Sequence, residues 1–159
     1  SFSASKSILY NLYNKYGTSQ KIIEWSIATL NTDGPLNGLS KKKRQAIFEF
    51  SRYLKCMPLN QNDWHEMPLN EFRKEIKKIW GVGNWSSDML AIFYLARFDV
   101  WPESDVGLRR ACKIVFGEKD TVDIKKIIVG CETVTALYLW EFINKRLTPQ
   151  YIDHNGQLD

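Results

Sequence analysis

The sequence is poor in the residues that mark stapled, fibrous or membrane-spanning proteins. Its 159 residues include three cysteines, nine glycines and five prolines. The cysteines stand far apart and form no Cys-x-x-Cys pair, which argues against a zinc or iron–sulfur site and fits reduced thiols in a cytosolic protein. The low glycine and proline content argues against a fibrous or disordered chain. No apolar run reaches the roughly 20 residues that a membrane-spanning helix needs.

The composition that remains is that of an ordinary globular protein. Hydrophobic residues make up 44% and charged residues 25%, enough for one domain with a core. The net charge of +4 suits a polyanionic partner, although many proteins with neutral ligands are equally basic. Basic residues cluster at Lys41–Arg44, Lys74–Lys78 and Arg109–Arg110. Each cluster taken alone is typical of the solvated face of a helix.

Apolar residues recur at the three- and four-residue spacing of amphipathic helices. No strict alternation is long enough to predict a sheet, so we expect an all-α fold of about eight helices with short loops, a helical bundle. We expect Gly17 to end the first helix, Thr18 or Ser19 to cap the second, and Ser40 to cap a basic third helix whose Leu54 points inward. The later helices are predicted from about residue 69 to Trp80, and over 86–98, 105–116, 122–129 and 133–145.

The segment "KKIWGVGNWSSDML" places Gly81 and Gly83 between two predicted helices, one ending at Trp80 and one starting at Trp85. Glycines permit positive φ and close approach of another backbone. The second helix would present unpaired N–H groups and its positive dipole end, which together bind a phosphate. The carbonyls of the turn can also converge on a monovalent cation. A glycine C-cap followed by an ordinary turn explains the same pattern, and for this segment alone it is the better explanation.

A second feature is Asp105, at the end of the extended, proline-containing stretch in "DVWPESDVGLRRA". An aspartate in this place commonly caps a helix. It can also be a carboxylate that a rigid loop directs into a cleft. Both roles are compatible, since a capping position fixes the direction of the side chain.

Taken together, these stretches resemble the helix-hairpin-helix base-excision DNA glycosylases. The resemblance lies in the Gly-Val-Gly hairpin followed by Trp85, in Pro102-x-x-Asp105-x-x-Leu108-x-Arg110, in "GLSKKKRQAI" and in the terminal "TALYLWEFI". The chain is most similar to the 3-methyladenine DNA glycosylase II branch, which removes alkylated bases. The resemblance extends from Ser3 to Asn144. It implies one glycosylase domain over residues 1–147, followed by a polar tail over 148–159.

The resemblance implies Asp105 as the catalytic residue and double-stranded DNA with a damaged base as the partner of a monomeric enzyme. No cofactor is required. A structural Na⁺ or K⁺ is implied at the hairpin, bound by the carbonyls of Lys77, Ile79 and Val82. The implied DNA-binding residues are Gly81, Val82, Gly83, Asn84, Lys42 and Lys43. The implied location is with the DNA, in the bacterial cytoplasm or in a nucleus.

The base pocket implied by the resemblance is formed by Trp85, Met89 and Trp101. Bifunctional glycosylase/lyases have a nucleophilic lysine at the position of Trp85, so the resemblance implies hydrolysis without lyase activity. For Trp85 itself, a place in the core competes with a place in the pocket wall. Met89 stands where the alkyladenine branch often has an aromatic residue. The sequence begins near the family's Gln-x-x-Ser turn, and the helices that precede this turn in the family are missing from it.

Other functions fit parts of the sequence. A non-catalytic helix-hairpin-helix DNA-binding domain would keep the hairpin and the basic clusters without needing Asp105. A glycosylase for oxidised guanine, or for mismatched thymine or uracil, is a second alternative. A purely structural helical bundle would leave the combination of hairpin and aspartate unexplained.

Overall fold

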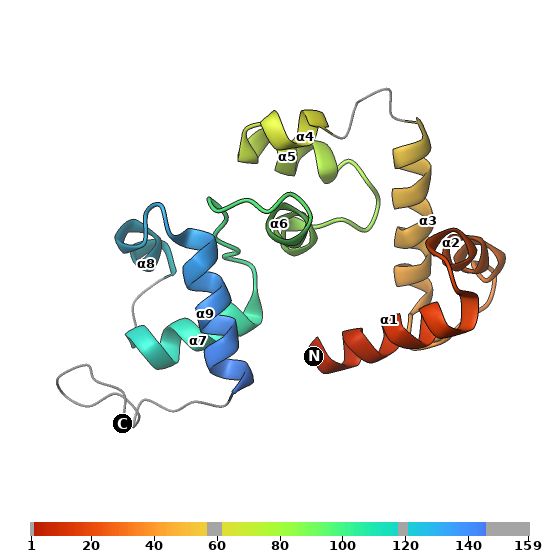
Figure 1. Cartoon of the computed structure of the whole chain (residues 1–159), viewed down its shortest axis with the longest axis horizontal. Helices are drawn as coiled ribbons and strands as arrows, with labels where there is room; N and C mark the ends of the chain where they lie inside the picture. The colour runs from red at the N-terminus through yellow and green to blue at the C-terminus, as the bar shows by residue number, and fades with distance from the viewer. Residues whose placement is uncertain (1, 57–61, 118–120, 146–159) are drawn as a thin grey trace. The chain divides into compact units, whose positions relative to one another are not determined.

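The computed structural model describes residues 2–56, 62–117 and 121–145. Within these ranges the chain forms α-helices and no strand, which confirms the all-α prediction (Figure 1). The helices are α1 (Phe2–Tyr16), α2 (Ser19–Ala28), α3 (Lys41–Cys56), α4 (Asn62–Glu66), α5 (Leu69–Ile76), α6 (Asn84–Phe93), α7 (Val106–Phe116), α8 (Thr121–Ile127) and α9 (Glu132–Asn144). The short helix α4 was not predicted. No helix among the described residues is long and apolar enough to cross a membrane.

The chain folds into two compact units, each built from two stretches of sequence. The first unit comprises residues 1–63 and 75–82, and the second comprises residues 64–74 and 83–159. A single glycosylase domain over residues 1–147 therefore stays a prediction. The predicted tail over 148–159 lies outside the described residues.

In the first unit, α1 packs on α2 and α2 packs on α3 (Figure 1). Two of the predicted helix ends are confirmed. Gly17 ends α1 at φ +80°, where glycine is favoured, and the Thr18 side chain accepts a hydrogen bond from the Lys21 N–H at the start of α2. Leu54 was predicted to point inward, but it is exposed at the end of α3.

Arg44 differs most from its prediction. As the last residue of the run Lys41–Arg44 it was expected on a solvated helix face, yet the side chain is completely buried. Its guanidinium donates hydrogen bonds to four backbone carbonyls of the α2–α3 connection. These belong to Thr29, Thr32, Gly34 and Leu39, at 2.6–3.2 Å. The planar guanidinium carries several N–H donors, so one buried Arg44 side chain can pair with several carbonyls of this irregular connection at once and stabilise it.

The end of α5 also corrects a prediction, because this helix stops at Ile76 rather than at Trp80. Beyond Ile76 the chain tightens into i→i−3 hydrogen bonds: the N–H groups of Lys78 and Ile79 donate to the carbonyls of Glu75 and Ile76. Phe72, Ile76 and Ile79 are buried, as the apolar spacing predicted.

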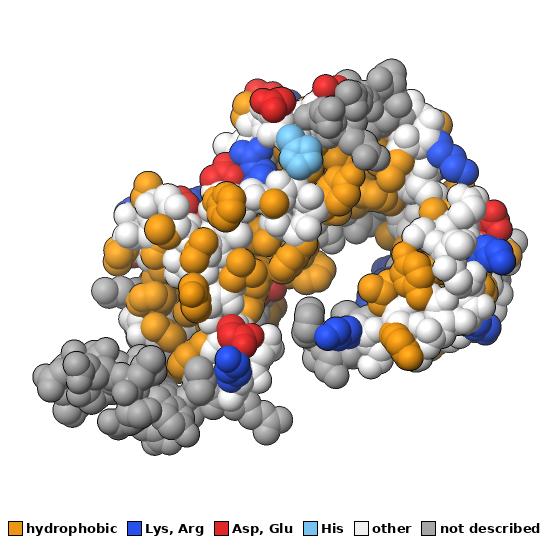
Figure 2. Space-filling view, viewed as in Figure 1, with side chains coloured by type: hydrophobic (Ala, Val, Ile, Leu, Met, Phe, Trp, Pro, Cys, Tyr) orange, Lys and Arg blue, Asp and Glu red, His pale blue; other side chains and the backbone are white. Residues whose placement is uncertain are grey.

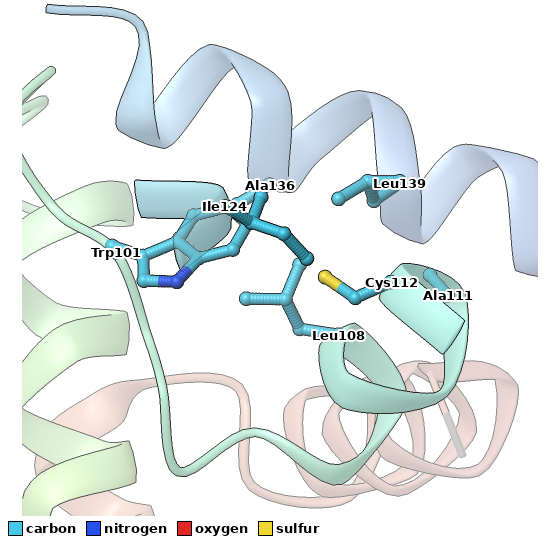
Figure 3. Close-up of a cluster of buried hydrophobic side chains, with 7 residues drawn as sticks. All are labelled: Trp101, Leu108, Ala111, Cys112, Ile124, Ala136 and Leu139. Carbon is cyan, nitrogen blue, oxygen red and sulfur yellow. The ribbon is translucent and has the colours of Figure 1, made fainter. Parts of the chain in front are cut away.

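The second unit has its core between α7, α8 and α9 (Figure 3). In Figure 3 the side chains of Leu108 and Cys112 from α7, Ile124 from α8 and Ala136 and Leu139 from α9 converge, with the ring of Trp101 closing one end. Burial in this apolar cluster raises the pKa of the Cys112 thiol. The thiol therefore stays protonated.

Helix α9 is apolar on most of its surface. Thr133, Ala136 and Leu139 are buried against the core, whereas Val134, Leu137 and Tyr138 are exposed. Figure 2 shows hydrophobic side chains spread over α7, α8 and α9 on the face in view.

Helix α6 was predicted over 86–98, but it runs from Asn84 to Phe93. Its carboxyl end is fixed by Ala96, which takes the left-handed conformation at φ +51° and turns the chain out of the helix. The Arg97 side chain then donates to the Met67 carbonyl and to both carboxylate oxygens of Asp99. These hydrogen bonds anchor the start of the loop that leads to Asp105.

Candidate active site

The loop that carries Asp105 is held at both ends by hydrogen bonds. Near its start, the Thr133 side chain of α9 accepts from the Val100 N–H and donates to the Val100 carbonyl, each at 3.1 Å. The Thr133 N–H donates to the Phe98 carbonyl. Near its end, the Asp105 N–H donates to the Pro102 carbonyl at 2.9 Å. The loop therefore carries Asp105 to the start of α7 on a backbone that has little freedom.

Asp105 is half-buried and caps α7, which confirms the capping prediction. Its Oδ1 accepts from the Leu108 N–H at 2.6 Å and from the Trp140 indole N–H at 2.9 Å. Its Oδ2 accepts from the Trp85 indole N–H at 2.6 Å. All three are hydrogen bonds that an ionised carboxylate makes.

The structure decides between the two predictions made for Trp85. Its side chain is 51% exposed, so it is not a core residue. It lies in the first turn of α6 and contacts Asp105 instead of an apolar cluster. Met89, one turn further along α6, is half-buried. Trp85 and Asp105, predicted separately for one site, are brought together.

Trp140 is the residue that sequence reasoning missed. It lies in α9, 35 positions from Asp105, and its indole N–H reaches the carboxylate. The ring of Phe93 stacks on it, with centroids 6.2 Å apart and an interplanar angle of 23°. Nothing in the spacing of "TALYLWEFI" distinguishes this tryptophan from a core residue.

Trp101 was predicted to stand in the wall of the base pocket, and this role stays a prediction; the side chain belongs to the core, with only 2% of its surface exposed. Its indole N–H is buried and finds no hydrogen-bond partner among the described residues. The ring closes the core and also lines a pocket of about 410 Å³. The other lining residues are Arg73, Asn84, Asp88, Glu103 and Ser104.

This pocket is polar and is braced by an ion pair. Arg73 Nε donates to Asp88 Oδ1 at 2.7 Å, and Asp88 is buried in α6. Asn84 and Asp88 line the pocket one turn apart, whereas Trp85 points to Asp105. The pocket and the carboxylate thus use neighbouring faces of α6.

The two hairpin glycines differ in conformation. Gly81 has φ +86°, and a β-carbon built on it would meet that of Ala46 at 2.8 Å. Gly83 has φ −100°, an ordinary extended conformation, with open space where a β-carbon would stand. Only Gly81 therefore needs to be glycine for the fold. Gly83 is the N-cap of α6 and, having no side chain, offers no capping hydrogen bond to the first-turn amides of this helix.

The remaining predicted residues lie in the first unit. Lys42 and Lys43 are exposed in the first turn of α3, and the neighbouring Lys41 pairs with Asp33 at 2.8 Å. Among the carbonyls predicted to bind a cation, that of Ile79 accepts the Val82 N–H at 3.1 Å. A carbonyl oxygen has a second lone pair, so this hydrogen bond leaves room for one further interaction.

Comparison with known proteins gives related sequences and a related fold, although no protein-family model matches. The chain is 29% identical to the alkylbase DNA glycosidase-like protein mag2 of Schizosaccharomyces pombe over 136 residues, which cover 80% of this chain and 62% of mag2. It is 26% identical over 111 residues to YfjP of Bacillus subtilis, whose name assigns it provisionally as a DNA-3-methyladenine glycosylase. That match covers 65% of this chain and 38% of YfjP.

The fold agrees with these sequences. The crystal structure of a DNA-3-methyladenine glycosidase from Bacillus halodurans superposes with a TM-score of 0.69 at 24% identity, covering 93% of this chain and 72% of that one. The chain is a relative of the helix-hairpin-helix DNA glycosylases. The predicted membership of this superfamily is thereby confirmed. The chain spans less than two thirds of the length of the two glycosylase relatives named above.

Proposed function

We propose that this chain is the catalytic domain of a monofunctional DNA glycosylase that excises alkylated bases during base excision repair. The names of its two sequence relatives support the alkylated-base substrate. The observation that carries the proposal is the half-buried Asp105 carboxylate, which is fixed on a braced loop and hydrogen-bonded to Trp85 and Trp140. A module that only bound DNA could use Asp105 as the cap of α7 but would not need the two indole donors that also hold its carboxylate.

The proposed chemistry begins with extrusion of the damaged nucleotide, since a base inside a duplex is out of reach of the protein. Alkylated purines carry positive charge and leave readily. The sugar that remains develops oxocarbenium character, and the Asp105 anion stabilises it electrostatically. The same carboxylate can accept a proton from the attacking water. The glycosidic C–N bond breaks, a C–O bond to water forms, and the DNA strand stays intact.

The direct test is base release by the full-length protein from duplexes that contain 3-methyladenine, hypoxanthine, uracil or oxidised guanine. We expect release of the alkylated base in single-turnover reactions. Asp105→Asn should abolish this release and largely retain duplex binding, while the exposed-site control Asp63→Asn should match the wild type. Undiminished excision by Asp105→Asn would refute the catalytic role. Tight binding without release from any duplex would favour a non-catalytic DNA-binding domain.

The absence of lyase activity is a separate part of the proposal. A lyase forms a Schiff base between an amine and the anomeric carbon, and a tryptophan such as Trp85 has no amine to offer. Borohydride should therefore fail to trap a covalent complex between the protein and DNA that contains an abasic site. Trapping by the wild type would show a nucleophilic amine elsewhere and would contradict the monofunctional assignment.

We also propose that the hairpin grips DNA through its backbone amides and binds Na⁺ or K⁺ through the carbonyls of Lys77, Ile79 and Val82. Oxygen-only ligands of this kind suit a hard cation. No other cofactor enters the proposal. Duplex affinity should be higher in K⁺ than in tetramethylammonium at equal ionic strength, since the larger ion does not fit between three carbonyls. Equal affinities in the two salts would count against the cation.

A further inference from the structure

We propose that Trp85 and Trp140 are positioning residues that hold the Asp105 carboxylate in one orientation through their indole N–H groups. The inference rests on the proposed function, in which this carboxylate faces the reacting sugar. It assigns a task to Trp140, which no sequence pattern had placed at the site. It also replaces the predicted pocket-wall role of Trp85 with a polar one.

The geometry of the three hydrogen bonds supports this role. A carboxylate rotates readily about its Cβ–Cγ bond, because the final torsion of aspartate has broad preferences. The cap to the Leu108 N–H holds Oδ1 at 2.6 Å but leaves the plane of the group free to turn. The Trp85 N–H holds Oδ2 at 2.6 Å from the opposite element, α6, and thereby fixes the plane.

Trp140 completes the arrangement from a third element, α9, by donating to Oδ1 at 2.9 Å. Its ring is itself held, since Phe93 stacks on it at a centroid distance of 6.2 Å. A carboxylate has about four lone-pair positions, so three donors leave one position for the sugar or a water molecule. The hydrogen bonds thus determine which side of Asp105 is available for chemistry.

The chemistry of tryptophan suits this task better than that of the usual partners of aspartate. An indole N–H only donates and carries no charge, whereas Lys or Arg would add a positive charge. A positive charge next to Asp105 would repel the developing cationic sugar and cancel part of the field that stabilises it. Two neutral donors orient the anion and leave its charge available to the transition state.

The first test replaces each indole N–H while keeping the shape of the ring. Incorporation of β-(3-benzothienyl)alanine at position 85 or 140 puts sulfur in place of N–H, and Trp→Phe at each position gives a second variant. We expect the single-turnover excision rate to fall roughly tenfold or more, since loss of alignment at a reacting centre is costly. The dissociation constant for the duplex should stay within about twofold of the wild-type value. Trp25→Phe, which replaces the indole that stacks on Tyr16, is the matched control and should leave the excision rate unchanged.

Two results of this test overturn the proposal. One is an unchanged excision rate in the benzothienyl variants. The other is a loss of rate that comes with an equal loss of duplex affinity and a lower melting temperature, because a purely structural role would produce that pattern.

The second test does not depend on activity and separates this inference from the proposed function. Charge-assisted hydrogen bonds move the indole N–H resonances of Trp85 and Trp140 downfield in ¹H–¹⁵N spectra. Asp105→Ala should shift both resonances upfield and leave that of Trp25 in place. If the wild type releases no base, the proposed function fails, while these shifts still decide whether the two indoles hold the carboxylate. Indole resonances that do not respond to Asp105→Ala overturn the positioning role.

Discussion

A β-carbon added to Gly81 would lie 2.8 Å from the β-carbon of Ala46, so the hairpin turn rests directly on α3. Both residues belong to the first unit. Gly81 also has φ +86°, a conformation that side chains with a β-carbon seldom adopt. Two independent constraints therefore require glycine at this position. Gly83, two residues later, is under neither constraint.

Gly81→Ala should therefore destabilise the protein by about 2–5 kcal/mol, the sum of the left-handed backbone penalty and overpacking against α3. Gly83→Ala is the matched control and should cost less than about 1 kcal/mol, the scale of a helix-cap effect. Urea unfolding monitored by circular dichroism measures both changes. Adding Ala46→Gly to Gly81→Ala should recover part of the loss, and equal effects of the two single substitutions would contradict the seating of the turn on α3.

Gly107→Ala should separate stability from activity. The added β-carbon would approach Asp105 Oδ1 to 3.1 Å and the Trp140 ring to 3.8 Å, so the carboxylate must shift by a few tenths of an ångström, which changes its orientation but leaves its cap to the Leu108 N–H within hydrogen-bond range. Alanine is the better helix former, so the stability of α7 should stay the same or rise by up to about 1 kcal/mol. We expect slower single-turnover excision with an unchanged or higher urea midpoint. A variant that excises at the wild-type rate would mean that Asp105 tolerates the crowding.

The acid sensitivity of the first unit should depend on Glu75. Hydrogen bonds from Lys78 and then from Tyr53 lower the pKa of Glu75 below its usual 4.5. The unfolded chain therefore binds this proton more readily, and the stabilisation is complete above pH 4.5 and is lost as the pH falls through the lowered pKa. The same pair raises the pKa of the Tyr53 phenol, largely through burial and then through its bond to Glu75.

Glu75→Gln should therefore cost a few tenths to about 1 kcal/mol at pH 7, and this cost should shrink as the pH falls below 4.5 and through the lowered pKa of Glu75. Urea titrations at a series of pH values measure the difference. The exposed Glu66→Gln serves as the control and should show a smaller dependence on pH. A cost that stays constant between pH 7 and pH 3 would exclude this linkage.

Lys42 and Lys43 should act on DNA through charge alone. Each lysine that neutralises a phosphate contributes about 0.9 to the slope of log affinity against log salt concentration. Lys42→Gln combined with Lys43→Gln should lower this slope by up to about 1.8 and weaken binding to every duplex alike. Fluorescence anisotropy across a salt series provides the measurement. Lys125→Gln combined with Lys126→Gln in α8 is the charge-matched control, and an equal decrease in both variants would mean that the α3 lysines have no special position.

The features that the sequence predicted correctly depend on neighbouring residues. Gly17 at the end of α1, Thr18 as a cap and Asp105 at the start of α7 follow from local hydrogen bonding, which short-range patterns record. The all-α class follows from apolar spacing in the same way. The helix ends at Ile76 and Phe93 were not predicted, because the apolar spacing continues beyond both residues. Tight turns end α5, and the left-handed conformation of Ala96 ends α6, before the apolar pattern stops.

The features that the sequence did not predict depend on contacts between distant residues. Trp140 meets Asp105 across 35 positions, and Arg44 reaches carbonyls up to 15 positions away. The run Lys41–Arg44 gives no sign that the Arg44 side chain, unlike its neighbours, points inward and donates hydrogen bonds to the carbonyls of a loop. The core alternative for Trp85 was wrong because a large aromatic residue in an amphipathic helix usually packs in a core, whereas this one is exposed and donates its N–H group.

The hydrogen bonds between Thr133 and Val100 make the Asp105 loop depend on the first turn of α9. Trp140, about two turns further along the same helix, depends on it as well. Detachment of this one helix would therefore release the loop and one of the indole donors in a single event. Local opening of α9 would thus abolish the proposed base excision before the whole chain unfolds, and heat should abolish excision at a lower temperature than it melts the protein.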